Sequence, residues 1–261
     1  GSGATGGVAA LTLAEAGINV LVIEAGPELT AEKAFGAEPI NTYRRISGVI
    51  SGSHQRQAQH PGYWKTNPLL YANERVNPYT FPEESPFIWT QGNQLGGRSL
   101  TWGGITLRLS DNEFQASKKD GFGPNWPITN ADLAPHYSEL EKRLKVHGNK
   151  DGLEQIPDGE FISPLPFTTC EKAFSKNVHN ELGYPVIHSR GFGPHNPSTN
   201  NPWPPSSSVG STLQMAIATG RVQLLTNKRA KHLIMFPGRE RARGVVVIDQ
   251  LSGAEMTLET K

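Results

Sequence analysis

The stretch GSGATGG at residues 1–7 sets the class of fold. Gly1, Gly3 and Gly6 match the pattern G-x-G-x-x-G, which joins a strand to a helix in dinucleotide-binding proteins. The first glycine of this pattern permits a tight turn, the second lets the backbone approach a pyrophosphate, and the third lets the helix pack closely against the strand. The loop therefore predicts a Rossmann-like α/β fold with a parallel sheet.

The residues after the loop continue the same pattern. VAALTLAEA at 8–16 is rich in Ala and Leu, which predicts a helix with Ala10 and Leu13 toward the sheet. INVLVIE at 18–24 is a β-branched run typical of a buried parallel strand. The positive end of the helix would offer free N–H groups to a phosphate, and this region contains Ala4 and Thr5.

Glu24 ends the predicted strand, 18 residues after Gly6 (24 minus 6). A carboxylate at this place accepts hydrogen bonds from the ribose hydroxyls of a dinucleotide, and it favours an unphosphorylated ribose. The pattern thus indicates FAD or NAD rather than NADP. The alternative is a plain glycine turn followed by a solvated acid at the end of a strand.

A second glycine cluster, GGRSLTWGG at residues 96–104, favours FAD over NAD. It holds four glycines and two hydroxyl side chains within nine residues. Such a sequence lets the backbone pass close to a flat ring, and the N–H groups of its turns form anion-binding concavities. A glycine-rich surface loop with no ligand is the alternative.

Composition excludes several other classes of protein. The 25 basic and 24 acidic residues nearly balance, which argues against a nucleic-acid partner or an anionic membrane surface. No apolar run reaches the roughly 18 residues that a transmembrane segment needs. Cys170 is the single cysteine and the eight histidines lack ligand spacing, so no metal site is expected. No G-x-S-x-G motif supports a serine hydrolase.

The rest of the chain predicts an excursion, several helices and a β-meander. Residues 31–90 are polar and weakly periodic, and we interpret them as a lid or excursion. Helices are expected at 131–134, from Pro135 onward, and at 211–218, with a low-complexity loop at 191–208 between them. Four short β-rich runs close the chain, at 222–226, 230–236, 244–249 and 255–260. The turns between the last three are typical of an antiparallel meander.

Three blocks together resemble the N-terminal half of a glucose–methanol–choline (GMC) oxidoreductase. They are GSGATGG with VLVIEAGPE, then QLGGRSLTWGGITLRLSDNEF, then the closing helix and meander. The resemblance implies FAD as the cofactor, and it implies cofactor contacts at Gly1, Gly3, Ala4, Thr5, Gly6, Glu24, Gly97, Ser99, Trp102, Gly103, Gly104 and Ala230. Many family members have Asn in place of Trp102. Thr101 stands where some relatives attach the flavin through histidine, so the resemblance implies non-covalent FAD.

The resemblance also implies one FAD-binding domain over residues 1–261. Its expected parts are a dinucleotide βα unit without its first strand (1–30), a lid or excursion (31–90) and the second glycine signature (91–110). A helical and loop insertion (111–207) and a helix with the meander (208–261) follow. A C-terminal substrate domain is expected to be absent, which makes the fold incomplete at both ends.

The function implied by the resemblance is oxidation of CH–OH groups of alcohols or sugars by hydride transfer to flavin N5. The family's catalytic histidine and its His or Asn partner lie near its C-terminus and match nothing here, so the sequence offers no catalytic residue. The chain alone is then expected to be inactive. A non-catalytic nucleotide-binding module and an NAD-linked dehydrogenase are the alternatives. The sequence names neither the electron acceptor nor the compartment, which is cytoplasmic, periplasmic or secreted.

Overall fold

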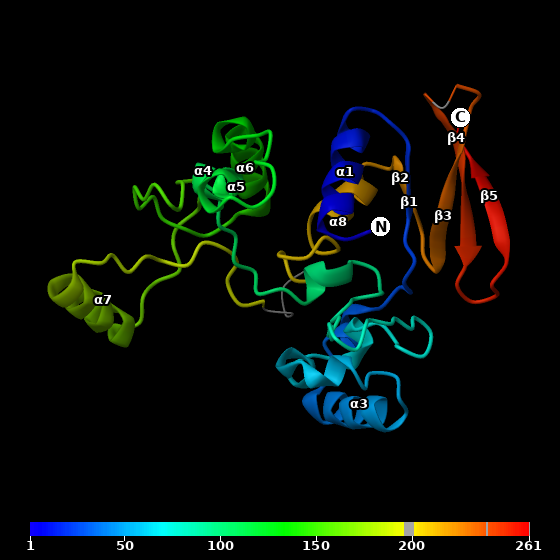
Figure 1. Ribbon diagram of the computed structural model, residues 1–261, viewed down its shortest axis with the longest axis horizontal. Helices are drawn as coiled ribbons and strands as arrows, with labels where there is room; N and C mark the ends of the chain where they lie inside the picture. The colour runs from blue at the N-terminus through cyan, green and yellow to red at the C-terminus, as the bar shows by residue number, and fades with distance from the viewer. Residues whose placement is uncertain (196–200, 239, 261) are drawn as a thin grey trace. The chain divides into compact units, whose positions relative to one another are not determined.

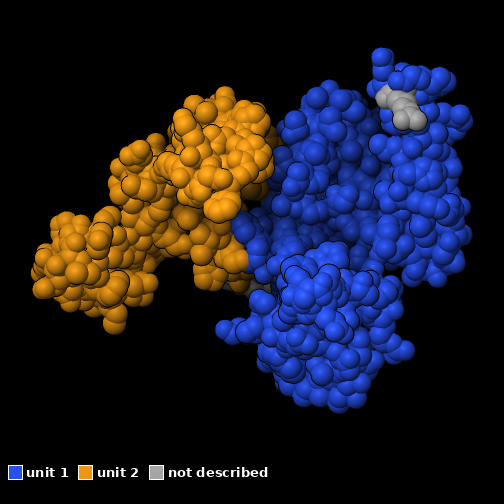
Figure 2. Space-filling view, in the orientation of Figure 1, with its two compact units in different colours: residues 1–102, 196–261 blue, residues 103–195 orange. Residues whose placement is uncertain are grey.

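A computed structural model describes residues 1–195, 201–238 and 240–260, which form two compact units. The first unit comprises residues 1–102 and 196–261, and the second comprises residues 103–195 (Figures 1 and 2). The first contains a parallel strand pair, helices and an antiparallel sheet. This arrangement confirms the predicted α/β fold class with an added meander. The division into one domain of five parts stays a prediction.

The first unit is built on two parallel strands and two helices. Strand β1 (Val20–Ile23) pairs with β2 (Val222–Leu225), with Val20 opposite Val222. Helix α1 (Ala4–Glu15) packs against α8 (Thr212–Ala218). A Cβ on Gly7 would lie 2.5 Å from Thr212 Oγ1, so this glycine permits the close crossing of the two helices.

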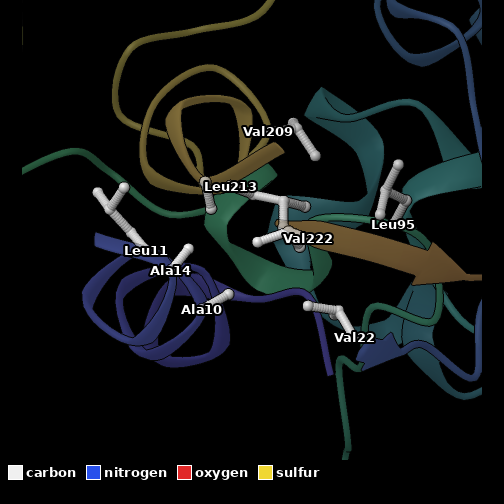
Figure 3. Close-up of a cluster of buried hydrophobic side chains, with 9 residues drawn as sticks. Ala10, Leu11, Ala14, Val22, Leu95, Val209, Leu213 and Val222 are labelled. Atoms are coloured by element: carbon white, nitrogen blue, oxygen red, sulfur yellow. The ribbon is translucent and has the colours of Figure 1, made fainter. Parts of the chain in front are cut away.

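Buried aliphatic side chains join these elements into a core (Figure 3). Helix α1 contributes Ala10, Leu11 and Ala14, whereas Leu13 is 42% exposed. The prediction that Leu13 faces the sheet was therefore wrong, because the buried stripe follows spacings of three and four residues from Ala10 and Leu11. The other buried members are Val22, Leu95, Val209, Leu213, Ala216 and Val222.

An antiparallel meander follows β2 directly. Its strands are β3 (Lys228–Met235), β4 (Ala242–Asp249) and β5 (Glu255–Glu259), in the order β3-β4-β5. Asp249 accepts N–H bonds from the turn before β5, which holds that connection. The first β-rich run of the four is not part of this sheet, because β2 pairs with β1 instead.

The segment predicted as a weakly periodic excursion contains regular structure. It holds α3 (Glu38–Ile50) and four short pieces, namely α2 (Ala31–Ala34), η1 (Gln57–Gln59), η2 (Pro61–Lys65) and η3 (Pro68–Leu70). Helix α3 buries Asn41, Arg45 and Gly48 and exposes Ile40 and Ile50. Because its buried face is polar, a search for buried apolar periodicity does not find it.

The second unit contains α4 (Asp111–Phe114), α5 (Ala116–Asp120), α6 (Asn130–Leu144) and α7 (Thr169–Leu182). Helix α6 passes through Pro135, so the two predicted helices are one. A capping box at Thr129 starts it and holds its first turn. Helix α7 was not predicted, and it buries no side chain among its described residues.

Two buried arginines hold the loops of the second unit. Arg108 donates from Nε and Nη2 to both carboxylate oxygens of Glu141, at 2.9 and 2.6 Å. Arg190 is fully buried, and its Nη2 donates to Asp151 and Asp158, each at 2.9 Å. Both arginines are therefore paired within the framework of this unit, as buried charges require.

Candidate dinucleotide-binding site

The first turn of α1 presents backbone N–H groups without a partner. Gly3 is the N-cap, with extended φ and ψ of −69° and −170°. The first helical bond runs from Gly7 N to Gly3 O at 2.9 Å, which leaves the N–H groups of Ala4, Thr5 and Gly6 unbonded within the described residues. The same region offers no side-chain cap and no acid in the first turn. This end of α1 therefore carries an uncompensated positive dipole.

Gly3 and Gly6 have different roles. A Cβ on Gly6 would collide with the carbonyl oxygen of Gly1, so this glycine lets the helix start lie on the turn before it. A Cβ on Gly3 would meet only Gly96 O, at 4.0 Å. Gly3 therefore faces space that the protein does not fill.

Glu24 lies beside this loop at the end of β1. It is 8% exposed, and its Oε2 accepts from Ser2 N at 2.8 Å and from Ser2 Oγ at 2.6 Å. Its Oε1 accepts from Gly26 N at 2.8 Å. Glu24 is thus a fixed, buried carboxylate rather than a solvated one, and Oε1 keeps capacity for a further donor.

The second glycine cluster lies against the first. Gly96 and Gly97 have φ of 85° and 51°, in the left-handed region that favours glycine, and they lead into η4 (Gly97–Leu100). A Cβ on Gly97 would be 3.9 Å from Gly3 Cα. The fold therefore joins two stretches that are more than 90 residues apart in the sequence.

Ser99 and Trp102 are held by the turn before α8. Ser99 is 8% exposed; its Oγ donates to Gly96 O at 2.6 Å and accepts from Ser208 N at 3.0 Å. Trp102 is 41% exposed, and its Nε1 donates to Ser206 O at 3.0 Å. Ser99 therefore joins backbone segments, while Trp102 keeps much of its ring open to solvent.

Three other predicted residues are not among those that these contacts join. Gly103 and Gly104 belong to the second unit, where Gly104 has φ of 70° and its carbonyl accepts from Phe192 N at 3.0 Å. Ala230 is exposed on β3, opposite Val247 of β4. The first unit thus brings together Gly1, Gly3, Ala4, Thr5, Gly6, Glu24, Gly97 and Ser99.

A basic residue next to Glu24 is already paired. Lys228 N donates to Glu24 O at 2.9 Å, while Lys228 Nζ donates to Asp249 at 2.6 Å. This bond, with N–H donors from Ser252 and Leu251, holds the pKa of the Asp249 carboxyl well below its usual range. The ammonium group of Lys228 is therefore occupied within the meander.

Sequence reasoning missed Ser2, Gly96 and Ser208 as parts of this cluster. Ser2 Oγ accepts from Gly96 N at 2.9 Å, and Ser208 Oγ donates to Ser2 O at 2.6 Å. Ser208 had been assigned to the end of a low-complexity loop. The three serines at 206–208, shortly before α8, are the sequence signal that could have indicated a structured turn.

The predicted absence of a membrane span and of a metal site can be compared with the described residues only. No helix among them has the length and apolar character to cross a membrane. In the same part of the chain, His, Cys, Asp and Glu do not gather in groups that could hold a metal ion.

Comparisons with known proteins show what the sequence and the fold are similar to. The chain is 30% identical to paromamine 6'-oxidase of Streptomyces fradiae over 155 residues, which are 58% of this chain and 23% of that protein. It is 21% identical to the fructose dehydrogenase large subunit of Gluconobacter japonicus over 203 residues, 75% of this chain and 36% of that subunit. No family model matches the chain.

Among solved structures, an FAD-dependent oxidoreductase from Chaetomium thermophilum is similar over the whole chain. It superposes with a TM-score of 0.57 at 18% identity, and the match covers 43% of that protein. Together these findings confirm the fold and the predicted resemblance to the GMC oxidoreductases. The chain spans less than half the length of each of these three proteins.

Proposed function

We propose that this chain is the FAD-binding part of a GMC-type oxidoreductase that oxidises CH–OH groups of alcohols or sugars. The observation that carries the proposal is the uncapped start of α1 beside Gly3, with the fixed carboxylate of Glu24 at its side. On this proposal residues 1–261 form one FAD-binding domain.

The residues present fit a dinucleotide. A pyrophosphate is anionic, and the N–H groups at the start of α1 with the helix dipole favour an anion. Gly3 leaves space for the close approach, and no carboxylate lies in the first turn of this fully described helix to repel the anion. Glu24 Oε1 has remaining capacity to accept from a ribose hydroxyl.

Each predicted residue receives a role on this proposal. The loop Gly1–Gly6 would hold the pyrophosphate, and Glu24 the adenosine ribose. The backbone of Ala230 would approach the adenine. The second signature would lie along the pyrophosphate and the flavin ring, with contacts from Gly97, Trp102, Gly103 and Gly104, while the predicted contact of Ser99 could come from its backbone, because its hydroxyl is bonded within the protein. Thr101 offers no imidazole for a covalent link, so the cofactor would be held non-covalently.

When bound, FAD supplies at its N5 atom the acceptor for a hydride from the substrate carbon. This chain's own contribution is to bind and orient that group through fixed backbone donors, which are set before the ligand arrives. The acid–base pair of the family matches no residue here, so substrate activation is assigned to residues outside this sequence. The names of the two relatives, an oxidase and a dehydrogenase subunit, leave the electron acceptor open.

A spectrum and a titration test the proposal. The purified chain, incubated with FAD and desalted, is expected to keep flavin absorbance, and titration with NAD is expected to give weaker binding. A colourless protein that binds NAD instead would contradict the proposal and support an NAD-linked dehydrogenase. No turnover of sugars with a dye acceptor is expected from this chain alone, and robust turnover would contradict the statement that the acid–base pair matches no residue here.

A further inference from the structure

Three buried serines connect the segments that form the candidate site. Ser2 precedes α1, Ser99 lies in η4, and Ser208 lies in the turn before α8. They are 0%, 8% and 3% exposed. The three serines lie far apart in the sequence. Their hydroxyl groups therefore connect segments that are not joined directly by the backbone.

The direction of each hydroxyl proton follows from its partners. Ser2 Oγ accepts from Gly96 N at 2.9 Å, and it donates to Glu24 Oε2 at 2.6 Å. Ser208 Oγ donates to Ser2 O at 2.6 Å, while Ser208 N donates to Ser99 Oγ at 3.0 Å. Ser99 Oγ donates in turn to Gly96 O at 2.6 Å. Both the N–H and the C=O of Gly96 are thereby fixed.

We propose that Ser2, Ser99 and Ser208 form a hydroxyl latch that sets the distance between the Gly1–Gly6 loop and the second glycine cluster, with Ser208 as its central positioning residue. The proposal rests on the proposed function, since the latch positions both halves of the FAD site. Without it, the left-handed turn at Gly96 and Gly97 keeps its local bonds and the neighbouring bond from Leu95 N to Pro27 O at 2.9 Å, and its place relative to Gly3 is less defined.

The hydrogen bonds of the latch show that the hydroxyl groups of Ser99 and Ser208 are bonded to the protein itself. Ser99 was predicted as a cofactor contact, but both roles of its hydroxyl, donor and acceptor, are used within the protein. Ser208 Oγ donates to a backbone carbonyl in the same way. Both serines are therefore positioning residues, acting through the backbone of Gly96 and Ser2.

The chain provides two matched controls in the same turn. Ser206 makes no side-chain hydrogen bond within the described residues, although its carbonyl accepts from Trp102. Ser207 is fully buried, but its hydroxyl bonds only to Pro204 O and Gly210 N within its own turn. Ser206→Ala reports on substitution alone, and Ser207→Ala reports on loss of a buried bond without loss of the latch.

The test compares binding of FAD and of ADP, which contains only the adenosine diphosphate half. Ser208→Ala and Ser99→Ala are each expected to weaken FAD binding about tenfold and ADP binding by less than about threefold, since ADP relies mainly on the loop and Glu24. The visible circular dichroism of bound flavin should change as well. Ser207→Ala should lower the melting temperature while leaving the FAD affinity and this spectrum unchanged.

The double variant Ser99→Ala/Ser208→Ala gives a second measurement. Because both single changes break one latch, the double variant is expected to bind FAD about as weakly as either single variant. Simple multiplication of the two effects would overturn the latch as a unit. Equal loss of FAD and ADP binding, or an effect of Ser207→Ala equal to that of Ser208→Ala, would also overturn it.

Amide hydrogen exchange tests the latch without any ligand. In the apo chain, Ser208→Ala should speed exchange at residues 94–100, and Ser207→Ala should not. If the unsubstituted chain binds neither FAD nor ADP, the proposed function fails, and the exchange measurement still decides the latch. If it binds both but exchange at 94–100 is the same in all variants, the latch fails and the proposed function stands.

Discussion

Helix α1 begins differently from α6 and α7. Helix α6 starts with a capping box in which Thr129 Oγ1 and Asp132 satisfy each other's backbone N–H groups, and α7 repeats it with Thr168 and Glu171. Helix α1 starts with Gly3 and, within the described residues, has no side-chain cap. A capping side chain in place of Gly3 would stabilise α1 by a few tenths of a kcal/mol, so α1 forgoes this stability where an anion is proposed to bind.

The contrast concerns these three helices. Helices α6 and α7 satisfy their first N–H groups with their own side chains, whereas α1 leaves its first N–H groups available for the proposed anion. Helix α1 also has no acid in its first turn, where α6 and α7 each have one. Four sets of variants test this comparison.

The largest effect is expected from giving α1 the cap that it lacks. Gly3→Asp places a carboxylate acceptor at an N-cap with the extended backbone that such residues adopt. The apo chain should gain a few tenths of a kcal/mol of unfolding free energy from the cap and about 0.3–1 kcal/mol from the negative charge at the helix N-terminus. The same charge should weaken FAD binding on the order of a hundredfold, because it replaces and repels the pyrophosphate. Thermal melting and FAD titration measure the two effects.

Gly3→Val is the control for this change. Its Cβ meets only Gly96 O at 4.0 Å, so the protein should still fold, but the branched side chain would fill the proposed pyrophosphate position without capping the helix. Loss of FAD binding without gain of stability is expected. Wild-type flavin content in both variants would disprove the role of this turn.

Glu24→Ala should have the next largest effect. Loss of one charge-assisted bond to the ribose should weaken FAD binding by roughly 1.5–3 kcal/mol. The variant should also melt lower, because Ser2 N, Ser2 Oγ and Gly26 N lose their acceptor. The exposed carboxylate of Glu28 supplies the matched control, Glu28→Ala, which should change neither quantity. Unchanged FAD affinity in Glu24→Ala would remove Glu24 from the site.

Removing a framework cap should have a smaller effect, confined to stability. Thr129→Ala and Thr168→Ala are each expected to cost about 1 kcal/mol in unfolding free energy, measured by urea denaturation. FAD affinity should stay at the wild-type value, since these helices donate their first N–H groups to side chains. Thr80→Ala controls for substitution of threonine alone, because Thr80 is exposed and its side chain makes no hydrogen bond within the described residues. A parallel loss of FAD binding would show that the caps are not separate from the site.

The smallest effect is a pH dependence that α6 and α7 have and α1 lacks. The Thr129 hydroxyl and N–H hold the pKa of Asp132 below its usual value, and the Thr168 N–H and hydroxyl do the same for Glu171. A carboxyl whose pKa is lower in the folded state stabilises that state when the pH is above its unfolded pKa. This stabilisation is lost as the pH falls from the unfolded pKa to the lowered folded pKa.

Hydrogen-exchange protection factors measure this dependence helix by helix. As the pH falls below about 4.5, the ordinary pKa used for Glu171, the first turn of α7 should lose protection while the first turn of α1 stays unchanged. Glu171→Gln should make α7 insensitive to pH over the same range. Equal loss of protection in α1 and α7 would point to global acid unfolding instead.

The parts of the fold that sequence predicted are those governed by local rules. The loop, α1, β1, α8 and the meander follow from glycine spacing, β-branched runs and turn residues, and the structure contains them. Helix α3 was missed because it buries Asn41 and Arg45. Helix α7 was missed because it buries nothing within the described residues, so no apolar stripe marks it.

The candidate site divides in the same way. Glycine spacing and Glu24 were readable from the sequence because a tight turn and an acid at a strand end are local features. The bonds of Ser2 to Gly96 and of Ser208 to Ser2 depend on contacts across 94 and 206 residues, which no local pattern contains. Trp102 was predicted as a cofactor contact; it is 41% exposed, and its Nε1 bond to Ser206 O joins residues 104 positions apart, which local sequence also does not show.

The separation between Ser2 and Ser208 has a consequence for how the protein is made. These residues are 206 positions apart. Strand β1 likewise pairs with β2, which is synthesised about as many residues later. At a synthesis rate of about 5–20 residues per second, α1 and β1 remain without their partners for roughly 10–40 s. Residues 103–195 form a compact unit of their own and can fold during that interval. The candidate nucleotide site would therefore be among the last features to assemble, and its unpaired strand would be open to chaperones in the meantime.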